Sequence, residues 1–311
     1  MRRLRILTWQ VHGSYMYYLL HAPHDFYLAV GKDNSGSRGQ NTHWPDNTTD
    51  VPEKQIKDLE FDLILFQTRQ NYEVDQYEFL SEKQRRLPRI YLEHDPPRQA
   101  PTDTRHWVDD PEVLLVHCTH FNNLMWDNNR TPSRVIEHGV TIPEGVRYSG
   151  ELEKGIVVIN GLKQRGRRLG TDIFEQARRE IPLDLLGIDW QASNGLGEIP
   201  LPDLPAFEAR YRFFFNPIRY TSLGLAVLEA MLTGLPVVGL ATTEMVMVIQ
   251  NGVNGYIDTN PAVLTERMRE LLDDPAQARK LGEGARQTVL DRFNIQRFAR
   301  DWDETFRMVA G

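Results

Sequence analysis

Short apolar runs alternate with longer, mostly polar stretches through the first half of the chain. Several of these runs are almost unbroken, which is typical of parallel strands that are buried on both faces of a sheet. Between two of them lies Glu73–Arg86, which carries apolar residues at helical spacing. This succession of strand, helix and strand predicts right-handed crossovers and a doubly wound sheet. The predicted strands are Leu4–Thr8, Phe26–Val30, Phe61–Phe66, Arg89–Glu93, Val113–His117 and Arg134–Glu137.

The stretch Asp33–Val51 departs from this pattern. It is rich in Asn, Ser, Gly, Thr, Asp and Pro, and it is longer than the loops that compact domains usually keep. Two interpretations stay open, a flexible surface insertion and a loop that binds substrate.

The strand pattern restarts in the second half of the chain. Before it, Thr141–Gly155 has little apolar content and holds one proline and three glycines, which predicts a linker. The chain is therefore predicted to be an α/β protein, with Rossmann-like doubly wound domains over residues 1–145 and 155–290 and a C-terminal helix over 291–311. The predicted strands of this half are Ile156–Asn160, Leu183–Leu186, Phe213–Phe215, Pro236–Leu240 and Gly255–Ile257, and the helical stretches are Asp172–Arg179, Leu223–Thr233, Pro261–Leu271 and Ala276–Val309, the last with a break near Phe293.

Length and composition agree with two packed domains. The chain has 311 residues, of which 41% are hydrophobic and 25% are charged, close to the globular average. Its net charge of −7 argues against a nucleic-acid partner, whose binding site would be a basic domain or stripe. We expect at most peripheral contact with a membrane surface.

The chain has one cysteine, Cys118, so neither an intrachain disulfide nor a multi-cysteine zinc site is expected. The start of the chain is basic, but the apolar run behind it is short and is broken by Gln10 and His12. No window of the sequence reaches the length of about 18 apolar residues that a membrane span needs. These features predict a cytoplasmic protein.

The most informative segment is Asn216–Glu229. An apolar strand is predicted to end at Asn216-Pro217, and a helix to open near Thr221–Leu223 with Ser or Thr as its N-cap. Gly224 would allow a ligand to approach the first turn closely. The N–H groups and the positive dipole end of such a helix form an anion site at the carboxyl edge of a parallel sheet. Two turns further on, the carboxylate of Glu229 would accept hydrogen bonds from a ribose diol if its face borders the cleft.

This segment resembles the signature of the retaining GT-B glycosyltransferases of the large sucrose-synthase-like and mannosyltransferase-like family, the glycosyl transferases group 1. The usual form of the signature is P-S-x-x-E-x-F-G-L-x-x-L-E-A-M, followed by G-x-P-V-V and a later G-x-x-G turn. The residues that match are Pro217, Gly224-Leu225, Leu228-Glu229-Ala230-Met231, Gly234-Leu235-Pro236-Val237-Val238 and Asn251-Gly252-Val253-Asn254-Gly255-Tyr256.

The resemblance implies a fold, a reaction and a set of contacts. The fold would be GT-B, with two Rossmann-like domains facing across a cleft and a C-terminal helix that crosses back to the first domain. The reaction would transfer a sugar from a nucleoside-diphosphate sugar to an acceptor, with retention in the family's manner and without metal or cofactor. The acceptor is unidentified and stands open among a saccharide, a lipid-linked molecule and a small molecule. In the donor site, Leu223 and Gly224 would bind the diphosphate and Glu229 would bind the ribose. Thr221 and Ser222 are further candidates for binding the donor.

Two positions depart from the family pattern. The family's first glutamate, which touches the donor sugar, falls at Thr221, and a hydroxyl cannot replace its charge. The glutamate that usually precedes the later turn falls at Met247, with Glu244 three residues too early. Either the enzyme handles its donor differently, or it has lost some or all of its activity.

A basic, glycine-containing loop follows the first strand of the second domain. Lys163, Arg165 and Arg168 would stabilise the charge that develops on a diphosphate leaving group. In the family a G-R…K-G segment supplies an Arg and a Lys here, but Leu162 and Leu169 occupy those two positions. The cations are candidate replacements, with Lys163 and Arg165 as catalytic candidates and Arg168 as a donor-binding one. A solvated basic loop is the alternative.

The first domain offers two further candidates. Gly13 lies in His12-Gly13-Ser14 after the first strand, where the family keeps a small-residue loop facing the cleft, so it would contact phosphate or acceptor or form a simple turn. His94 ends another strand, where many family members carry a histidine near the donor sugar. Its imidazole would hydrogen-bond a sugar hydroxyl or the reacting oxygen, and the alternative is a turn histidine fixed by Asp95 and Pro96.

Other patterns are given structural interpretations. His117 and His120 have metal-ligand spacing but lie at a strand end without matching ligands, so we expect no metal site. The aromatic run Tyr15–Tyr18 is expected to lie in the core of the first helix. Two rival functions remain: a nucleotide-sugar epimerase, for which the sequence supplies no clear acid and base, and a non-catalytic nucleotide-sugar binder or assembly partner.

Overall fold

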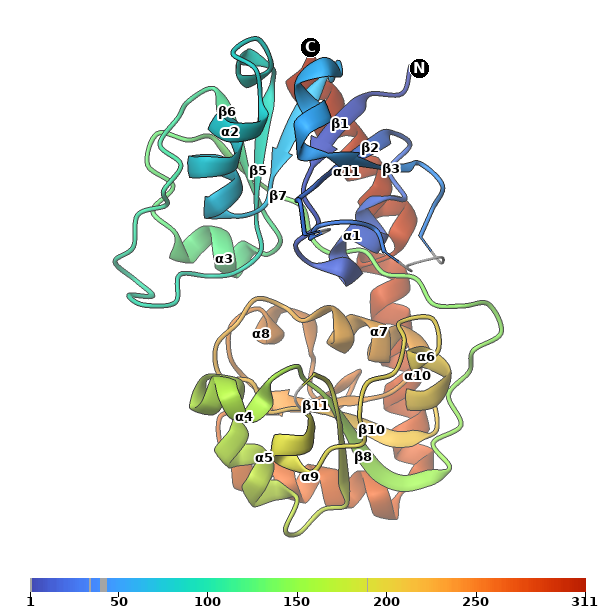
Figure 1. Ribbon diagram of the computed structural model, residues 1–311. Helices are drawn as coiled ribbons and strands as arrows, with labels where there is room; N and C mark the ends of the chain where they lie inside the picture. The colour runs from blue at the N-terminus through green and yellow to red at the C-terminus, as the bar shows by residue number, and fades with distance from the viewer. Residues whose placement is uncertain (1, 34, 40–43, 189) are drawn as a thin grey trace. The chain divides into compact units, whose positions relative to one another are not determined.

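The computed structural model describes residues 2–33, 35–39, 44–188 and 190–311. The chain forms two compact units (Figure 1). Unit 1 consists of Met1–Gly139 together with Ile295–Gly311, and unit 2 is Val140–Asn294. Each unit is built on one parallel sheet flanked by helices, so the predicted α/β, doubly wound class is confirmed.

The sheet of unit 1 has seven strands in the order β3-β2-β1-β4-β5-β6-β7, and all neighbours are parallel. This is the order of a Rossmann sheet, in which the direction of winding reverses between β1 and β4. The central strands have apolar residues on both faces, as the unbroken runs predicted. The strands are β1 Arg5–Thr8, β2 Asp25–Val30, β3 Thr48–Pro52, β4 Leu63–Phe66, β5 Arg89–Glu93, β6 Val113–His117 and β7 Ser133–Val135.

The polar stretch Asp33–Val51 is not a loop throughout. Its end forms β3, which pairs with β2 from Phe26↔Thr48 onward, so that part of the loop prediction is wrong. At the edge of the sheet only Val51 of this strand is fully buried, and the strand therefore lacks the apolar run that marks the others. Residues 34 and 40–43 of the same stretch lie outside the described residues.

The segment Glu73–Arg86 is divided into short pieces. The break follows Leu80, where the Oε1 atom of Gln84 accepts hydrogen bonds from the backbone N–H and the hydroxyl of Ser81. The amide nitrogen of Gln84 donates to the carbonyls of Ile56 and Leu59, so the turn is tied to the preceding segment. The helical pieces of unit 1 are α1 Gly13–Leu19, the 3-10 helix η1 Glu53–Asp58, the π-helix η2 Asn71–Asp75, α2 Gln76–Phe79, the 3-10 helix η3 Gln84–Arg86, α3 His120–Met125 and α11 Ile295–Ala310.

Helix α11 comes from the end of the chain and is part of unit 1 (Figure 1). Its apolar face includes Phe298, Trp302 and Phe306, all almost fully buried. The indole N–H of Trp302 donates to the hydroxyl of Tyr15, on α1, at 3.3 Å. Tyr15, Met16 and Tyr18 are buried, which confirms the structural interpretation of the aromatic run at these positions, whereas Tyr17 is only partly buried.

The sheet of unit 2 has five parallel strands in the order β12-β11-β10-β8-β9. This is a flavodoxin-like order, in which the winding reverses between β8 and β10. Strand β8 begins at Leu152, inside the predicted linker, because its first residues already pair with β10 at Tyr211. The strands are β8 Leu152–Val158, β9 Leu183–Leu186, β10 Tyr211–Asn216, β11 Val237–Leu240 and β12 Gly255–Asp258.

Helices cover the sheet of unit 2 and form its core with it. Ile173 and Phe174 of α5 and Met268 of α9 pack in one cluster with Phe213 and Phe215 of β10. Among the described residues, no helix is both long enough and apolar enough to cross a membrane. The helices are α4 Leu162–Arg165, the 3-10 helix η4 Gly166–Leu169, α5 Thr171–Ala177, the 3-10 helix η5 Trp190–Ser193, α6 Leu204–Glu208, α7 Leu225–Thr233, α8 Met245–Val248, α9 Pro261–Asp273 and α10 Pro275–Arg292.

Candidate functional site

The signature segment and the basic loop lie at the same edge of the sheet of unit 2. The basic loop follows β8, and the signature loop, residues 217–224, follows β10. Because β8 and β10 are neighbouring parallel strands, both loops leave from their carboxyl ends. The winding reverses between these two strands, and ligands of open α/β sheets bind at such a point.

Direct contacts join the two loops. The backbone N–H groups of Arg219 and Tyr220 donate to the carbonyl of Arg168 at 3.0 and 3.2 Å. The guanidinium of Arg219 makes a bidentate pair with the carboxylate of Asp172, at 2.6 and 2.7 Å, and also donates to the carbonyl of Arg167. Such paired hydrogen bonds fix orientation as well as distance. The loops therefore form one structural unit.

Gly170 allows the closest approach between these loops. It has φ +80°, in the left-handed region, and a Cβ atom there would lie 1.9 Å from the carbonyl oxygen of Pro217. The φ angle disfavours any other residue, and the contact with backbone leaves no room for a side chain. Glycine at this position is thus required by both conformation and packing.

The candidate residues of the basic loop differ from one another in burial. Lys163 and Arg165 are exposed on α4, and Arg168 is half-buried against the signature loop. Leu162 and Leu169, at the family's two cation positions, are each 2% exposed and belong to the core of unit 2. Any cation for a leaving group in this loop must therefore come from neighbouring positions.

The helix that follows the signature loop begins later than predicted. Its first residue is Leu225, and Gly224 in an extended conformation is its N-cap, without a side-chain capping hydrogen bond. The prediction that Ser or Thr caps a helix opening near Thr221–Leu223 is therefore wrong. Ser222 and Leu223 are buried in the loop, whereas Thr221 and Gly224 are partly exposed. The reason is tertiary, since hydrogen bonds of Arg219 hold the loop residues against the basic loop, about 50 positions earlier in the chain.

Glu229 lies in the second turn of α7 and is 3% exposed. A second carboxyl group approaches it from α6, where Glu208 is fully buried and its Oε1 atom lies 3.1 Å from the hydroxyl of Thr233. Burial and the charge of Glu229 both raise the pKa of Glu208 well above its usual range. The hydroxyl of Thr233 also donates a hydrogen bond to the backbone carbonyl of Glu229, at 2.9 Å. Burial and the neighbouring carboxyl group of Glu229 therefore favour the neutral form of Glu208.

The two departures further along the signature have different surroundings. Met247 is 61% exposed on α8. Glu244 is 2% exposed, directly precedes α8, and lies 4.0 Å from the guanidinium of Arg292. A buried carboxylate thus lies three residues before Met247, beside a guanidinium that is partly exposed.

In unit 1 the carboxyl ends of β1 and β4 are joined by a glutamine that follows β4. The amide nitrogen of Gln67 donates to the hydroxyl of Thr8 at 2.9 Å and to the carbonyl of Trp9 at 2.7 Å. Its amide oxygen lies 3.0 Å from Nε2 of His94, which follows β5. Gly13 is the first residue of α1, and a Cβ atom there would meet only Gln10, at 3.9 Å. The predicted residues Gly13 and His94 thus lie at the edge where the winding of this sheet reverses.

His94 is enclosed by polar and aromatic side chains. Its ring packs edge-on against those of His12 and Tyr15, with centroids 4.5 and 4.9 Å apart. Its backbone carbonyl accepts a hydrogen bond from the side-chain amide of Asn122. Burial, together with the neighbouring histidines, lowers the pKa of His94 well below 6.5, so the imidazole is neutral.

A cavity of about 820 Å³ opens beside this edge in unit 1. It lies among the residues that follow β1, β2, β3 and β4. Within the described part of the chain, three polar atoms of its lining residues are buried without a hydrogen-bond partner: Nε1 of Trp9, Oε1 of Gln10 and Oδ1 of Asn71. Trp9 and Asn71 are each only 6% exposed. Buried polar groups of this kind usually find a partner in water or a ligand.

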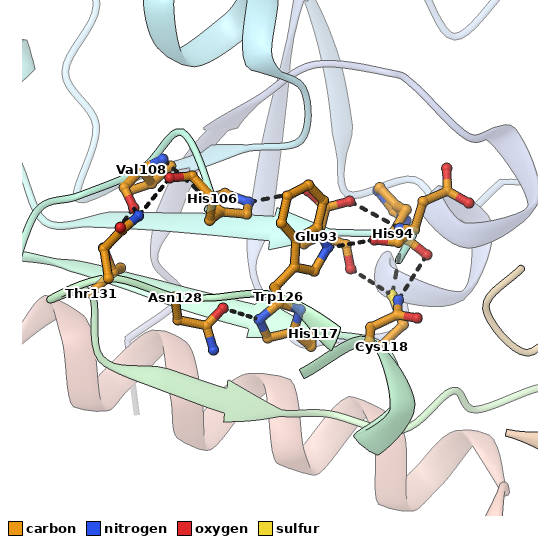
Figure 2. Close-up of polar contacts among 12 residues, drawn as sticks. Glu93, His94, His106, Val108, His117, Cys118, Trp126, Asn128 and Thr131 are labelled. Carbon is orange, nitrogen blue, oxygen red and sulfur yellow. Dashed lines mark hydrogen bonds and ion pairs between the residues drawn. The ribbon is translucent and has the colours of Figure 1, made fainter. Parts of the chain in front are cut away.

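A second group of buried polar residues lies at the carboxyl ends of β5 and β6 (Figure 2). The Oε1 atom of Glu93 accepts from the N–H of Asp95 at 2.9 Å, and Oε2 lies 3.1 Å from Nε2 of His106. The Nδ1 atom of His106 accepts from the N–H of Val108, so the ring proton is on Nε2 and is donated to Glu93. Burial raises the pKa of Glu93 to about 8 and lowers that of His106 to about 3. The pair is therefore largely neutral at pH 7.

This pair makes a prediction for stability against pH. Because the pKa of Glu93 rises from 4.5 to about 8 on folding, the folded state binds more protons in that window, and its stability is lost as pH rises. The lowered pKa of His106 acts in the opposite sense, but only below 6.5. Between about pH 6.5 and 8 Glu93 alone of the two titrates, with a slope of up to about 1.4 kcal/mol per pH unit. We expect Glu93→Gln to flatten the pH dependence of the free energy of unfolding in this window, measured by urea titration; an unchanged slope would contradict the assignment.

His117 and His120, the pair with metal-ligand spacing, have different surroundings. His117 is buried, and its Nε2 atom lies 3.0 Å from Oδ1 of Asn128. His120 is exposed at the start of α3. Among the described residues, no group of three or more His, Cys, Asp or Glu side chains is arranged to hold a metal ion.

Sequence reasoning missed several residues of these sites. Arg219 lies inside the signature segment but was not singled out, and Asp172 was treated only as a helix start. Glu208 and Gln67 gave no local signal, because each acts on a residue at least 21 positions away in the chain. A carboxylate and an amide within otherwise apolar stretches were the only indication available.

The comparisons with known proteins agree with the signature. Residues 183–274, which include the signature loop and α7, match the family model for glycosyl transferases group 1. The N-acetyl-alpha-D-glucosaminyl L-malate synthase of Bacillus anthracis is 32% identical over 89 residues, 27% of this chain. The sucrose synthase of Denitrovibrio acetiphilus is 27% identical over 183 residues, 53% of this chain. Each match spans 23% of the relative's own length.

Solved structures resemble the chain over nearly its whole length. The sucrose-phosphate synthase of Thermosynechococcus elongatus has a TM-score of 0.70 at 16% identity and covers 98% of this chain and 99% of that one. Anabaena HepE in complex with UDP-glucose has a TM-score of 0.69 at 14% identity and covers 98% and 100%. At such low identity these likenesses show the fold, which is GT-B as the resemblance implied. Together with the family match they confirm the resemblance to the group 1 glycosyltransferases.

Proposed function

We propose that this chain, which carries group 1 glycosyltransferase sequence in unit 2 and has the GT-B fold, moves a sugar from a nucleoside-diphosphate sugar to an acceptor bound by unit 1. The observation that carries the proposal is the position of the signature. Its loop and α7 lie at the carboxyl end of β10, beside the basic loop that follows β8, where the winding of the sheet reverses. This is where a doubly wound sheet binds a nucleotide.

The donor would be held through its diphosphate and its ribose. Leu223 and Gly224 directly precede the first turn of α7, and there the N–H groups and the positive end of the helix dipole would meet the diphosphate. Lys163, Arg165 and Arg168 of the basic loop would add positive charge as the leaving group forms. Glu229 would accept hydrogen bonds from the ribose hydroxyls. UDP and GDP are the candidate nucleotides, and HepE, which shares the fold, has been solved with UDP-glucose.

The reaction would proceed with retention and without a metal or a cofactor. Thr221 occupies the position where the family has a glutamate that touches the donor sugar, and it would offer a hydroxyl in place of a charge. Leaving-group stabilisation and positioning would then supply most of the catalysis, since no covalent nucleophile is evident.

The acceptor would enter the cavity of unit 1. The lining residues include the charged side chains Lys32, Asp33, Glu53 and Lys57, which suit the hydroxyl groups of a sugar-like or polar molecule. Trp9 and Phe79 offer apolar surface in the same cavity. A polar, hydroxyl-bearing acceptor therefore suits this cavity better than a wholly apolar one.

A second function is favoured by two specific observations. Thr221 replaces the family's first glutamate, and the family's two cation positions are filled by the buried residues Leu162 and Leu169. Both changes would weaken transfer more than binding. A non-catalytic nucleotide-sugar binder of the same fold is therefore the alternative.

A panel of UDP-, GDP- and ADP-sugars tests the proposal. We expect one nucleotide class to raise the Tm of unit 2 by mass action, and its sugar nucleotide to be consumed in the presence of an acceptor. The measurements are thermal shift and release of the nucleoside diphosphate. Stabilisation without turnover under any acceptor would favour the binder, and no stabilisation by any nucleotide would contradict the proposed function.

A further inference from the structure

The orientation of the Gln67 side chain is fixed by its surroundings. The residue follows β4 and is 4% exposed. Its amide nitrogen lies 2.7 Å from the carbonyl oxygen of Trp9, which can only accept, and 2.9 Å from the hydroxyl of Thr8. The hydroxyl of Thr8 in turn donates to the carbonyl of Leu65 and so accepts from Gln67. A flipped amide would set two oxygens against each other, so the amide oxygen must point the other way.

That amide oxygen determines which tautomer His94 adopts. It lies 3.0 Å from Nε2 of His94, and since it can only accept, the ring must carry its proton on Nε2. The second ring nitrogen, Nδ1, then carries a lone pair and can only accept. The thiol of Cys118 lies 4.0 Å from Nδ1 and 3.5 Å from the carbonyl of Glu93, so it makes at most a weak contact with that lone pair. Figure 2 shows His94 and Cys118 side by side at the ends of their strands.

We propose that Gln67 is a positioning residue for sugar transfer, which keeps the proton of His94 on Nε2 and leaves Nδ1 as the acceptor of the ring. The role of Gln67 in catalysis rests on the proposed function, whereas the tautomer of His94 follows from the hydrogen-bond geometry alone. His94 would then accept a hydrogen bond from a hydroxyl group and would not act as a cation beside the diphosphate. The positive charge that the leaving group needs is left to the basic loop of unit 2.

The groups around His94 also favour its neutral form. His12, Tyr15, Cys118 and His138 are the titratable side chains that face it or act on its charge, and none of them is an acid that would stabilise an imidazolium. A second proton on the ring would have to be placed on Nδ1, beside Cys118. The neutral Nε2–H form is thus the one that these neighbours favour.

The test is the protonation state of His94 in the full-length chain, measured by ¹⁵N NMR of the imidazole nitrogens. We expect the Nε2–H tautomer without protonation between about pH 5.5 and 8, in the range where an ordinary histidine titrates. A proton on Nδ1 in the wild-type protein would overturn the proposal. This measurement needs no variant and no substrate.

A charged variant sharpens the test. Gln67→Glu places a carboxylate against the Nε2–H group of His94. Its negative charge should raise the pKa of His94 by at least about one unit. Gln55→Glu adds the same charge at an exposed position on η1 and should leave the pKa of His94 unchanged. Equal titration of His94 in Gln67→Glu and Gln55→Glu would count against the role of Gln67.

Kinetics separate this inference from the proposed function. If the wild-type chain transfers sugar, Gln67→Glu should lower kcat at pH values below the raised pKa of His94. Its KM for the donor should stay within twofold of the wild-type value. An unchanged pH profile of kcat would overturn the positioning role. If the wild-type chain turns over no donor, the proposed function fails, and the NMR measurement still decides the tautomer.

Discussion

Replacing Glu229 with Gln is expected to lower kcat/KM for the sugar donor by about 10- to 150-fold. The carboxylate is the one charged group on α7 that the ribose hydroxyls would meet, and a hydrogen bond to a charged group contributes about 1.5–3 kcal/mol. Burial, the larger cause of the raised pKa of Glu208, persists when the charge of Glu229 is removed, so Glu208 would not replace the lost charge. The measurement is steady-state kinetics with the donor found in the nucleotide panel, together with nucleotide affinity by calorimetry.

The matched control for this variant is Glu266→Gln. Glu266 is exposed on α9 and undergoes the same chemical change away from the signature. We expect its kcat/KM to stay within twofold of the wild-type value. If Glu229→Gln behaved in the same way, Glu229 would not bind the ribose, and the donor site would have to be placed elsewhere.

Replacing Gly170 with Ala is expected to destabilise unit 2 and to weaken nucleotide binding. The left-handed backbone costs a non-glycine residue about 1–2 kcal/mol, and forcing extra atoms into a packed site costs about 1–3 kcal/mol more. The added Cβ would overlap the carbonyl oxygen of Pro217, at 1.9 Å, so the signature loop must move. The Tm should fall by about 2–4 °C for each kcal/mol lost, as read by calorimetry.

Gly161→Ala is the control that separates backbone strain from a steric clash. Gly161 has φ +60° and so carries the same left-handed strain, but a Cβ there meets only movable side-chain atoms, of Gln164 at 3.3 Å and of Arg165 at 3.5 Å. We expect it to lose only the strain contribution and to keep its nucleotide affinity. Equal losses of stability and affinity in the two variants would show that the contact between Gly170 and Pro217 does not shape the site.

Most strands were predictable from the sequence because they are buried on both faces. β5, β6 and β9 have the predicted bounds, and the other predicted strands differ at their ends. β3 was not predicted, because an edge strand with one fully buried residue has no apolar run to mark it. The break near Phe293 between the last two helices was also visible in the pattern.

The donor segment was predictable for a different reason. Its sequence resembles a family signature, and the match of residues 183–274 confirms that resemblance. The helix start was nevertheless placed too early, because the capping preference of Ser and Thr is a local rule. In the structure, Arg219 and the residues beside it are held by the basic loop, and the helix begins only at Leu225.

The sequence by itself thus determined the class of fold, the order of the strands along the chain and the segment that most resembles a donor site. Tertiary structure alone decided which side chains meet: Arg219 with Asp172, Glu208 with Thr233, and Gln67 with His94. The partners of each pair lie between 25 and 47 residues apart in the chain. The physical reason is that local patterns report burial and periodicity, whereas the neighbours of a parallel strand depend on crossovers. Where the winding reverses, between β8 and β10 and between β1 and β4, residues distant in sequence come together, and there the candidate sites lie.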